Sequence, residues 1–163
     1  MKLPSGRHRA LSGLLLALCL AGCEDAAAPY PPGESPQYRS HLEQARFFQS
    51  QGQLRASMTE ARNAITLVPD ARAPYFIIAE TLLISGDADR AIKAFAELLT
   101  VTTEDATPTE LNQARIGLAS AHLLKGQLDQ ASVYLDEITT DETRQILERL
   151  ELEARIALAR GED

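Results

Sequence analysis

Residues 82–99 read LLISGDADRAIKAFAELL and contain the turn that decides the fold. Gly86 separates two runs of strong helix formers. Because glycine tolerates the positive φ at which many helices end, this stretch predicts two helices joined by a tight turn. A glycine recurs in the same setting at Gly52, 34 residues earlier, and at Gly126, 40 residues later.

Aligning the three glycines also aligns the residues around them. Small residues recur in the helix before each turn and in the helix after it: Ala45, Ala79 and Ala119, then Ser57, Ala91 and Ala131. The next core positions are filled by Ala61, Phe95 and Leu135, and by Ala64, Leu98 and Ile138. Small residues let paired helices approach closely, and larger ones fill the gaps. We therefore expect these positions to form the helix–helix contacts.

This pattern resembles the tetratricopeptide (TPR) family, whose repeat is 34 residues long. Pro69 at the end of the first repeat and Tyr75 at the opening of the second fit that family. The resemblance implies an all-α, TPR-like α-solenoid of three helical hairpins plus a C-terminal helix, with repeats at 38–71, 72–105 and 112–145 and a partial fourth at 146–163. His41 and Arg115 replace the opening aromatic residue in repeats one and three. The alternative is an unrelated all-α bundle with chance glycines.

Helix boundaries follow from local signals. We expect helices at 38–51, 54–67, 72–85, 88–101, 108–125, 128–138 and 141–160, with six extra residues within 102–111. The run Thr107-Pro108-Thr109-Glu110 is a capping box with proline at the first helical position. The run Thr139-Thr140-Asp141-Glu142 has the same form and predicts a second capped helix start.

Composition agrees with an all-α protein and argues against nucleic-acid binding. Aromatic residues make up only 5% of the chain, and Trp is absent. The formal charge is −7, and removing residues 1–22 with their three cations, Lys2, Arg7 and Arg9, leaves −10. Phosphate backbones are bound by clustered Lys and Arg, and no basic stripe forms here. We expect no nucleic-acid partner.

The N-terminus has the pattern of a bacterial lipoprotein signal. Basic residues precede an apolar run at 11–20, which is too short to span a bilayer. Leu20-Ala21-Gly22-Cys23 resembles the lipobox, which implies cleavage after residue 22 and a lipid anchor on Cys23. The alternative is an ordinary secretory peptide with an incidental cysteine. Several acyl chains make such an anchor effectively permanent.

The segment after the anchor reads as a linker. Residues 23–37 hold the lipidated cysteine and a Pro-rich stretch, which we expect to be a disordered, semi-rigid tether. It would either give the folded part reach toward a partner or be a featureless spacer. Glu24, in place of the Asp that favours inner-membrane retention, implies the outer membrane. We expect a periplasm-facing protein of the bacterial cell envelope.

No catalytic or metal-binding motif is present in the sequence. His41 and His122 stand alone, without a Cys, His or Asp at the spacing of a metal face. Gly-rich phosphate loops and nucleophile motifs are also missing. We therefore expect no enzyme activity, metal, cofactor or small-molecule substrate.

The TPR resemblance places a partner-binding groove on the first helix of each pair. Carried over by position, the groove residues are Leu42, Arg46, Gln49, Phe76, Glu80, Leu83, Gln113, Ile116, Ser120, Leu123 and Arg155, with Glu151 beside them. For the apolar Phe76, Leu83, Ile116 and Leu123, periodicity cannot separate a groove position from a core position. The cations of a carboxylate-clamp TPR are missing, apart from Arg46.

The expected function is that of a scaffold. Lipid anchor and TPR stack together resemble lipoproteins of exopolysaccharide export, pilus assembly and outer-membrane assembly, so we expect a protein or peptide partner in a secretion, exopolysaccharide or pilus machine. Two alternatives remain: an N-terminal TPR handle of a larger envelope enzyme, and a structural oligomerisation module. The last helix fits either a solvent-facing cap or the first helix of a longer array.

Overall fold

A computed structural model of the chain describes residues 35–100 and 106–161. This part is all-α and contains seven helices: α1 (Pro36–Ser50), α2 (Leu54–Leu67), α3 (Ala73–Ile84), α4 (Ala88–Thr100), α5 (Pro108–Leu124), α6 (Leu128–Asp136) and α7 (Thr143–Arg160). All seven expected helices are present, and no helix end differs by more than two residues. The expected signal peptide, Cys23 and most of the linker lie outside the described residues.

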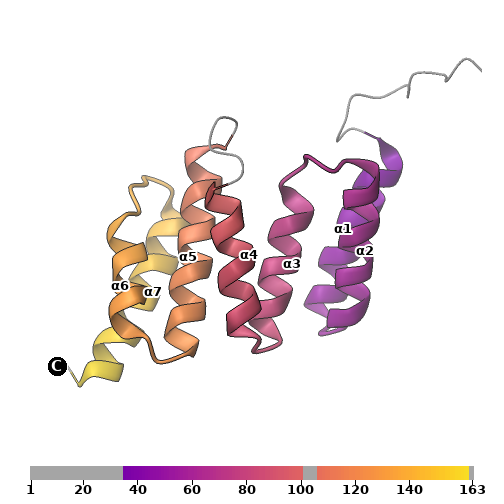
Figure 1. The fold of residues 1–163 in the computed structure, drawn as a ribbon. Helices are drawn as coiled ribbons and strands as arrows, with labels where there is room; N and C mark the ends of the chain where they lie inside the picture. The colour runs from indigo at the N-terminus through magenta and orange to yellow at the C-terminus, as the bar shows by residue number, and fades with distance from the viewer. Residues whose placement is uncertain (1–34, 101–105, 162–163) are drawn as a thin grey trace, which may run out of the picture.

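The helices pack in the order in which the chain makes them. Each helix contacts the next one along the chain, and α1 with α3, α3 with α5, and α5 with α7 also touch. Figure 1 shows the helices standing side by side in this order, from α1 and α2 at one end to α6 and α7 at the other. The odd-numbered helices therefore form a continuous row of neighbours.

The three turns that the glycines predicted have one geometry. Gly52, Gly86 and Gly126 have φ values of 70°, 81° and 71°. Each glycine N–H donates to the carbonyl three residues back, and the next N–H donates to the carbonyl five residues back. This is the Schellman arrangement, which satisfies the carbonyls at the end of a helix. The turns after α1, α3 and α5 are thus equivalent in backbone structure.

The predicted small and apolar positions are buried. Exposed fractions are at most 6% for all twelve: Ala45, Ser57, Ala61, Ala64, Ala79, Ala91, Phe95, Leu98, Ala119, Ala131, Leu135 and Ile138. They belong to a core that is divided along the row of helices into three clusters, around α1 and α2, around α3 to α5, and around α5 to α7. Because small and large residues alternate, each pair of helices can pack closely against the next pair.

One predicted helix start is confirmed and the other is wrong. Thr107 accepts from the N–H of Glu110, whose carboxylate accepts from the N–H of Thr107 in return (2.9 Å), so this capping box is formed. At the last helix no such box forms, because Glu142 is itself the N-cap residue and α7 begins one residue later. The Glu142 carboxylate accepts a hydrogen bond from the Thr109 hydroxyl, and not from a backbone N–H at the start of α7.

Candidate functional site

Glu80 of α3 carries a carboxylate that is bonded to the next odd-numbered helix. It is a half-buried residue of α3. Gln113 of α5 donates to its carboxylate across 2.8 Å. A half-buried carboxylate between packed helices is unusual enough to require such partners, because burial disfavours its charged form.

Gln49 joins α1 to the same place on α3. Its side-chain amide donates to the Ile77 carbonyl (3.3 Å) and to the Thr81 hydroxyl (3.0 Å). Thr81 is completely buried, and its hydroxyl donates to the Ile77 carbonyl (2.6 Å) and meets the Ser57 hydroxyl at 3.3 Å. Polar groups of α1, α2 and α3 are therefore connected at Thr81, the residue after Glu80.

Two arginines lie within electrostatic reach of this carboxylate. Burial raises the pKa of Glu80, while the hydrogen bond from Gln113 and the charges of Arg144 and Arg46 act in the opposite direction without cancelling the effect. Arg144 comes from the first turn of α7 and Arg46 from α1. We call the five residues Arg46, Gln49, Glu80, Gln113 and Arg144 the Glu80 row. The row takes side chains from all four odd-numbered helices.

The residues predicted for the groove divide between this row and the core. Arg46, Gln49, Glu80 and Gln113 are brought together in the Glu80 row. Leu42 and Phe76 are only 8% and 6% exposed and pack within the core clusters, where a partner cannot reach them. The remaining apolar ones, Leu83, Ile116 and Leu123, are half-buried and pack against the core with one side. Ser120 is half-buried as well.

Arg155 and Leu123 lie at another place, near the end of α7. Together with Leu124, Leu158 and Ala159 they line an open hollow of about 380 Å³. The guanidinium of Arg155 is exposed and lies 3.9 Å from the Glu151 carboxylate on the same helix. These residues therefore do not belong to the Glu80 row.

Arg144 is the member of the row that sequence reasoning missed. It lies within the helix expected at 141–160, but the TPR resemblance carries no groove position onto it. Its place in the first turn of α7 brings the Arg144 side chain within electrostatic reach of Glu80. It also forms an ion pair of 2.8 Å with Glu148.

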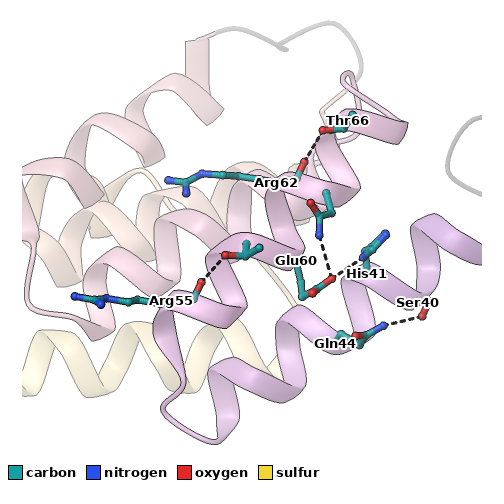
Figure 2. Close-up of polar contacts among 9 residues, drawn as sticks. Ser40, His41, Gln44, Arg55, Glu60, Arg62 and Thr66 are labelled. Carbon is teal, nitrogen blue, oxygen red and sulfur yellow. Dashed lines mark hydrogen bonds and ion pairs between the residues drawn. The ribbon is translucent and has the colours of Figure 1, made fainter.

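His41, which we expected to stand alone, pairs with a carboxylate. Its Nδ1 lies 2.6 Å from the Glu60 carboxylate and joins α1 to α2 (Figure 2). A histidine with a carboxylate is two thirds of a hydrolytic triad, which needs a hydroxyl or thiol in line with the imidazole. The neighbouring Ser40 hydroxyl accepts from Gln44 (2.9 Å), and the structure shows no bond between Ser40 and His41. The pair therefore acts as a polar link between two helices.

Residues 35–100 and 106–161 also bear on other kinds of site. No three His, Cys, Asp or Glu side chains gather in a way that could hold a metal ion. In the same residues, no helix combines the length and the apolar character that crossing a bilayer requires.

Comparison with protein-family models, with curated proteins and with solved structures finds no match to this chain.

Proposed function

We propose that this chain is a non-enzymatic scaffold of the TPR type that docks a protein partner through the Glu80 row. The TPR interpretation is supported by three equivalent Schellman turns spaced 34 and 40 residues apart and by the burial of all twelve aligned positions. The docking interpretation is carried by one observation: a half-buried carboxylate with a raised pKa lies on the face that the odd-numbered helices share.

The chemistry of the row favours a partner segment that carries a cation. Glu80 is desolvated without a full counter-charge, so a lysine or arginine of the partner would complete its neutralisation. Arg46 and Arg144, both exposed, can meet carbonyl or carboxylate oxygens of the same partner segment. Half-buried Leu83 and Ile116, on the same two helices as Glu80 and Gln113, add apolar area. An extended or helical peptide with one basic residue fits this arrangement.

The setting that we propose for this docking is the bacterial envelope. Lipidation of Cys23 and the Pro-rich linker would hold the helices on the periplasmic face of the outer membrane. The partner would then be a component of a secretion, exopolysaccharide or pilus assembly machine. This part of the proposal rests on residues 1–37 of the sequence.

Photo-crosslinking in the native bacterium tests the docking face. A photoreactive residue at Leu83 or Gln113 is expected to give a discrete adduct with one envelope protein. Matched probes at Arg62 on α2 and Lys93 on α4, both exposed on the even-numbered helices, are expected to give none. Adducts from Arg62 and Lys93 but not from Leu83 and Gln113 would show that the partner uses the other face.

A charge variant tests the role of Glu80 in the same experiment. Glu80→Lys places a cation where the partner's cation is expected, so the adduct at Leu83 should disappear. Glu80→Gln retains the hydrogen bond from Gln113 but removes the charge, so the adduct should weaken. If the adduct keeps its yield in both variants, docking does not depend on this carboxylate.

A further inference from the structure

The last helix, α7, is apolar on two opposite sides. Its inner side places Gln145, Leu152 and Ile156 in contact with α5 and α6. A second set of residues, Leu147, Leu150, Ala154 and Leu158, is exposed, with Leu158 reaching 81% exposure. At about 100° of rotation per residue, these four lie on one stripe that points away from the inner side. We call them the α7 stripe.

Within the part of the chain that the structure describes, the helices at the other end of the row carry no such stripe. The exposed side of α1 carries Arg39, Ser40, Glu43, Gln44, Arg46 and Ser50, with Phe47 as its one exposed large apolar residue. On α7, by contrast, three large apolar side chains follow one another along a single stripe. Leu124 at the end of α5 is exposed beside Leu158, where both line the hollow described above. Helices with apolar residues on two sides generally lie between two layers of protein.

We propose that the α7 stripe is the interface with a second copy of this chain, with the two α7 helices antiparallel. A twofold axis at the level of residue 152 would place Leu147 opposite Leu158 of the second copy, to within one residue along the helix. It would place Leu150 opposite Ala154 of the second copy, and the same contacts would recur on the other side of the axis. Large side chains then meet small ones at the centre of the interface and large ones at its ends. This alternation fills the space between two helices well.

The charges beside the stripe fit the same arrangement. Glu148, Glu151 and Arg155 lie on one flank of it, by helical spacing. In an antiparallel pair related by a twofold axis, each flank meets the same flank of the other copy. Arg155 would therefore lie beside Glu151 and Glu148 of the second copy, and these ion pairs would form twice. In a single chain the Arg155 side chain is exposed. Among the described residues, its one ion pair is with Glu151, at 3.9 Å.

The opposite flank widens the apolar contact. Ala157 and Ile146, both half-buried, would face each other across the axis. A parallel arrangement would instead set the charged flank of each copy against the apolar Ile146 and Ala157 of the other, which leaves Arg155 with no carboxylate of the second copy opposite it. Charge complementarity therefore selects the antiparallel second copy as the occupant of the stripe.

The first test measures self-association of the full chain. Two differently tagged full-length copies are produced in the same cells, extracted in mild detergent, and one is captured through its tag. The wild-type copies are expected to co-purify, and Leu150→Glu or Leu158→Glu should lower the yield about tenfold or more, because a charge then faces an apolar residue. The matched control Val133→Glu, an exposed apolar position on α6, should not change it. Absence of co-purification in the wild type, or equal loss in the control, would overturn the proposal.

The second test uses the ion pairs and does not depend on the apolar residues. Glu151→Arg alone and Arg155→Glu alone each place like charges opposite one another, so each variant should fail to capture its own kind. Mixing the two variants restores opposite charges on both sides of the axis, so they should capture each other at the wild-type yield. Failure of the mixture to recover would overturn the antiparallel arrangement. A photoreactive residue at Leu158 that joins only a different protein would show that the stripe belongs to another partner.

Discussion

The ring of Phe95 in α4 lies directly against the backbone of Gly117 in α5. A Cβ atom added at Gly117 would stand 2.4 Å from Cζ of that ring, much closer than non-bonded carbon atoms approach. Phe95 is 1% exposed and packs within the central core cluster, so its ring has no free space into which it could turn. The close approach of α4 and α5 therefore depends on the missing side chain of Gly117.

Gly117→Ala is expected to destabilise the fold by about 1 kcal/mol. Overpacking of a closed core costs about 1–3 kcal/mol, and the better helix propensity of alanine returns about 1 kcal/mol, so a clash with three ring atoms decides the sign. Urea unfolding followed by circular dichroism measures the difference. In a Phe95→Leu background the same substitution should be neutral or stabilising, and an unchanged loss there would contradict the steric explanation.

Gly86→Ala should also destabilise the fold, by about 1 kcal/mol, for a different reason. No atom lies within 4 Å of a Cβ built at Gly86, so the loss comes from its φ of 81° and not from a contact. Gly86→Asn should lose less than Gly86→Ala, because asparagine visits this conformation more readily. Equal losses in thermal unfolding for the two variants would show that conformational strain is not the cause.

The sequence predicted the positions that repeat and missed those that occur once. Glycine turns and small residues recur at a fixed spacing, so Gly52, Gly86 and Gly126 located the helix ends to within two residues. Gly117 is unique in its register, and its role becomes visible only when the Phe95 ring is placed against it. Local spacing describes a helix face, whereas a close approach is a property of two helices.

The same limit applies to the candidate site. Periodicity placed Phe76 on the face of α3 that points toward the neighbouring helices, but it could not tell that these helices cover the ring almost completely. Glu142 has the spacing of a capping-box residue, yet its carboxylate accepts from Thr109, 33 residues away. Partners at such distance in the chain leave no local signal.

Asn112 and Gln145 form a buried polar pair whose loss should destabilise the last helix. Asn112 donates to Gln145 (3.3 Å) and to the Thr139 carbonyl (3.0 Å), and Gln145 donates to the Thr109 carbonyl (2.9 Å). Gln145→Leu leaves the Thr109 carbonyl without its donor and the buried Asn112 amide without one of its acceptors, which costs about 1–3 kcal/mol.

A double-mutant cycle separates the pair from its surroundings. Asn112→Leu, Gln145→Leu and the double variant are compared by urea unfolding. Because the two side chains share a hydrogen bond, the double variant should lose less than the sum of the two single variants, by about 0.5 kcal/mol or more. Additive losses would mean that each amide acts only through its backbone partner. Thr59→Ala, whose exposed hydroxyl donates to the Arg55 carbonyl, serves as a neutral control.

The stability of the fold should depend on the protonation of Glu80. Its pKa is raised in the folded protein by burial, so the protonated form is favoured there. The stabilising contribution is complete below the ordinary pKa of 4.5 and is lost as the pH rises through the folded pKa. Glu80→Gln should therefore be more stable than the wild type at neutral pH and equal to it below the ordinary pKa. A variant that is less stable at pH 7 would contradict the sign of this shift.

The same Glu80→Gln substitution should weaken the proposed docking while it stabilises the fold. Such opposite effects are common where a site keeps a charge for a partner at the expense of stability. Measured on one variant, the two effects distinguish a docking residue from a residue that only supports the helices.

The order of the helices in space has a consequence for how the chain folds. Within the described residues, every helix touches only helices one or two places away along the chain. Contacts of such short range form quickly, and each can form without waiting for distant segments to arrive. Because the chain is synthesised from its N-terminus, α1 and α2 can associate first. Each later helix then packs against helices that have already formed. Local unfolding should start at the two ends of the row of helices. Amide hydrogen exchange should therefore be slowest in α3, α4 and α5.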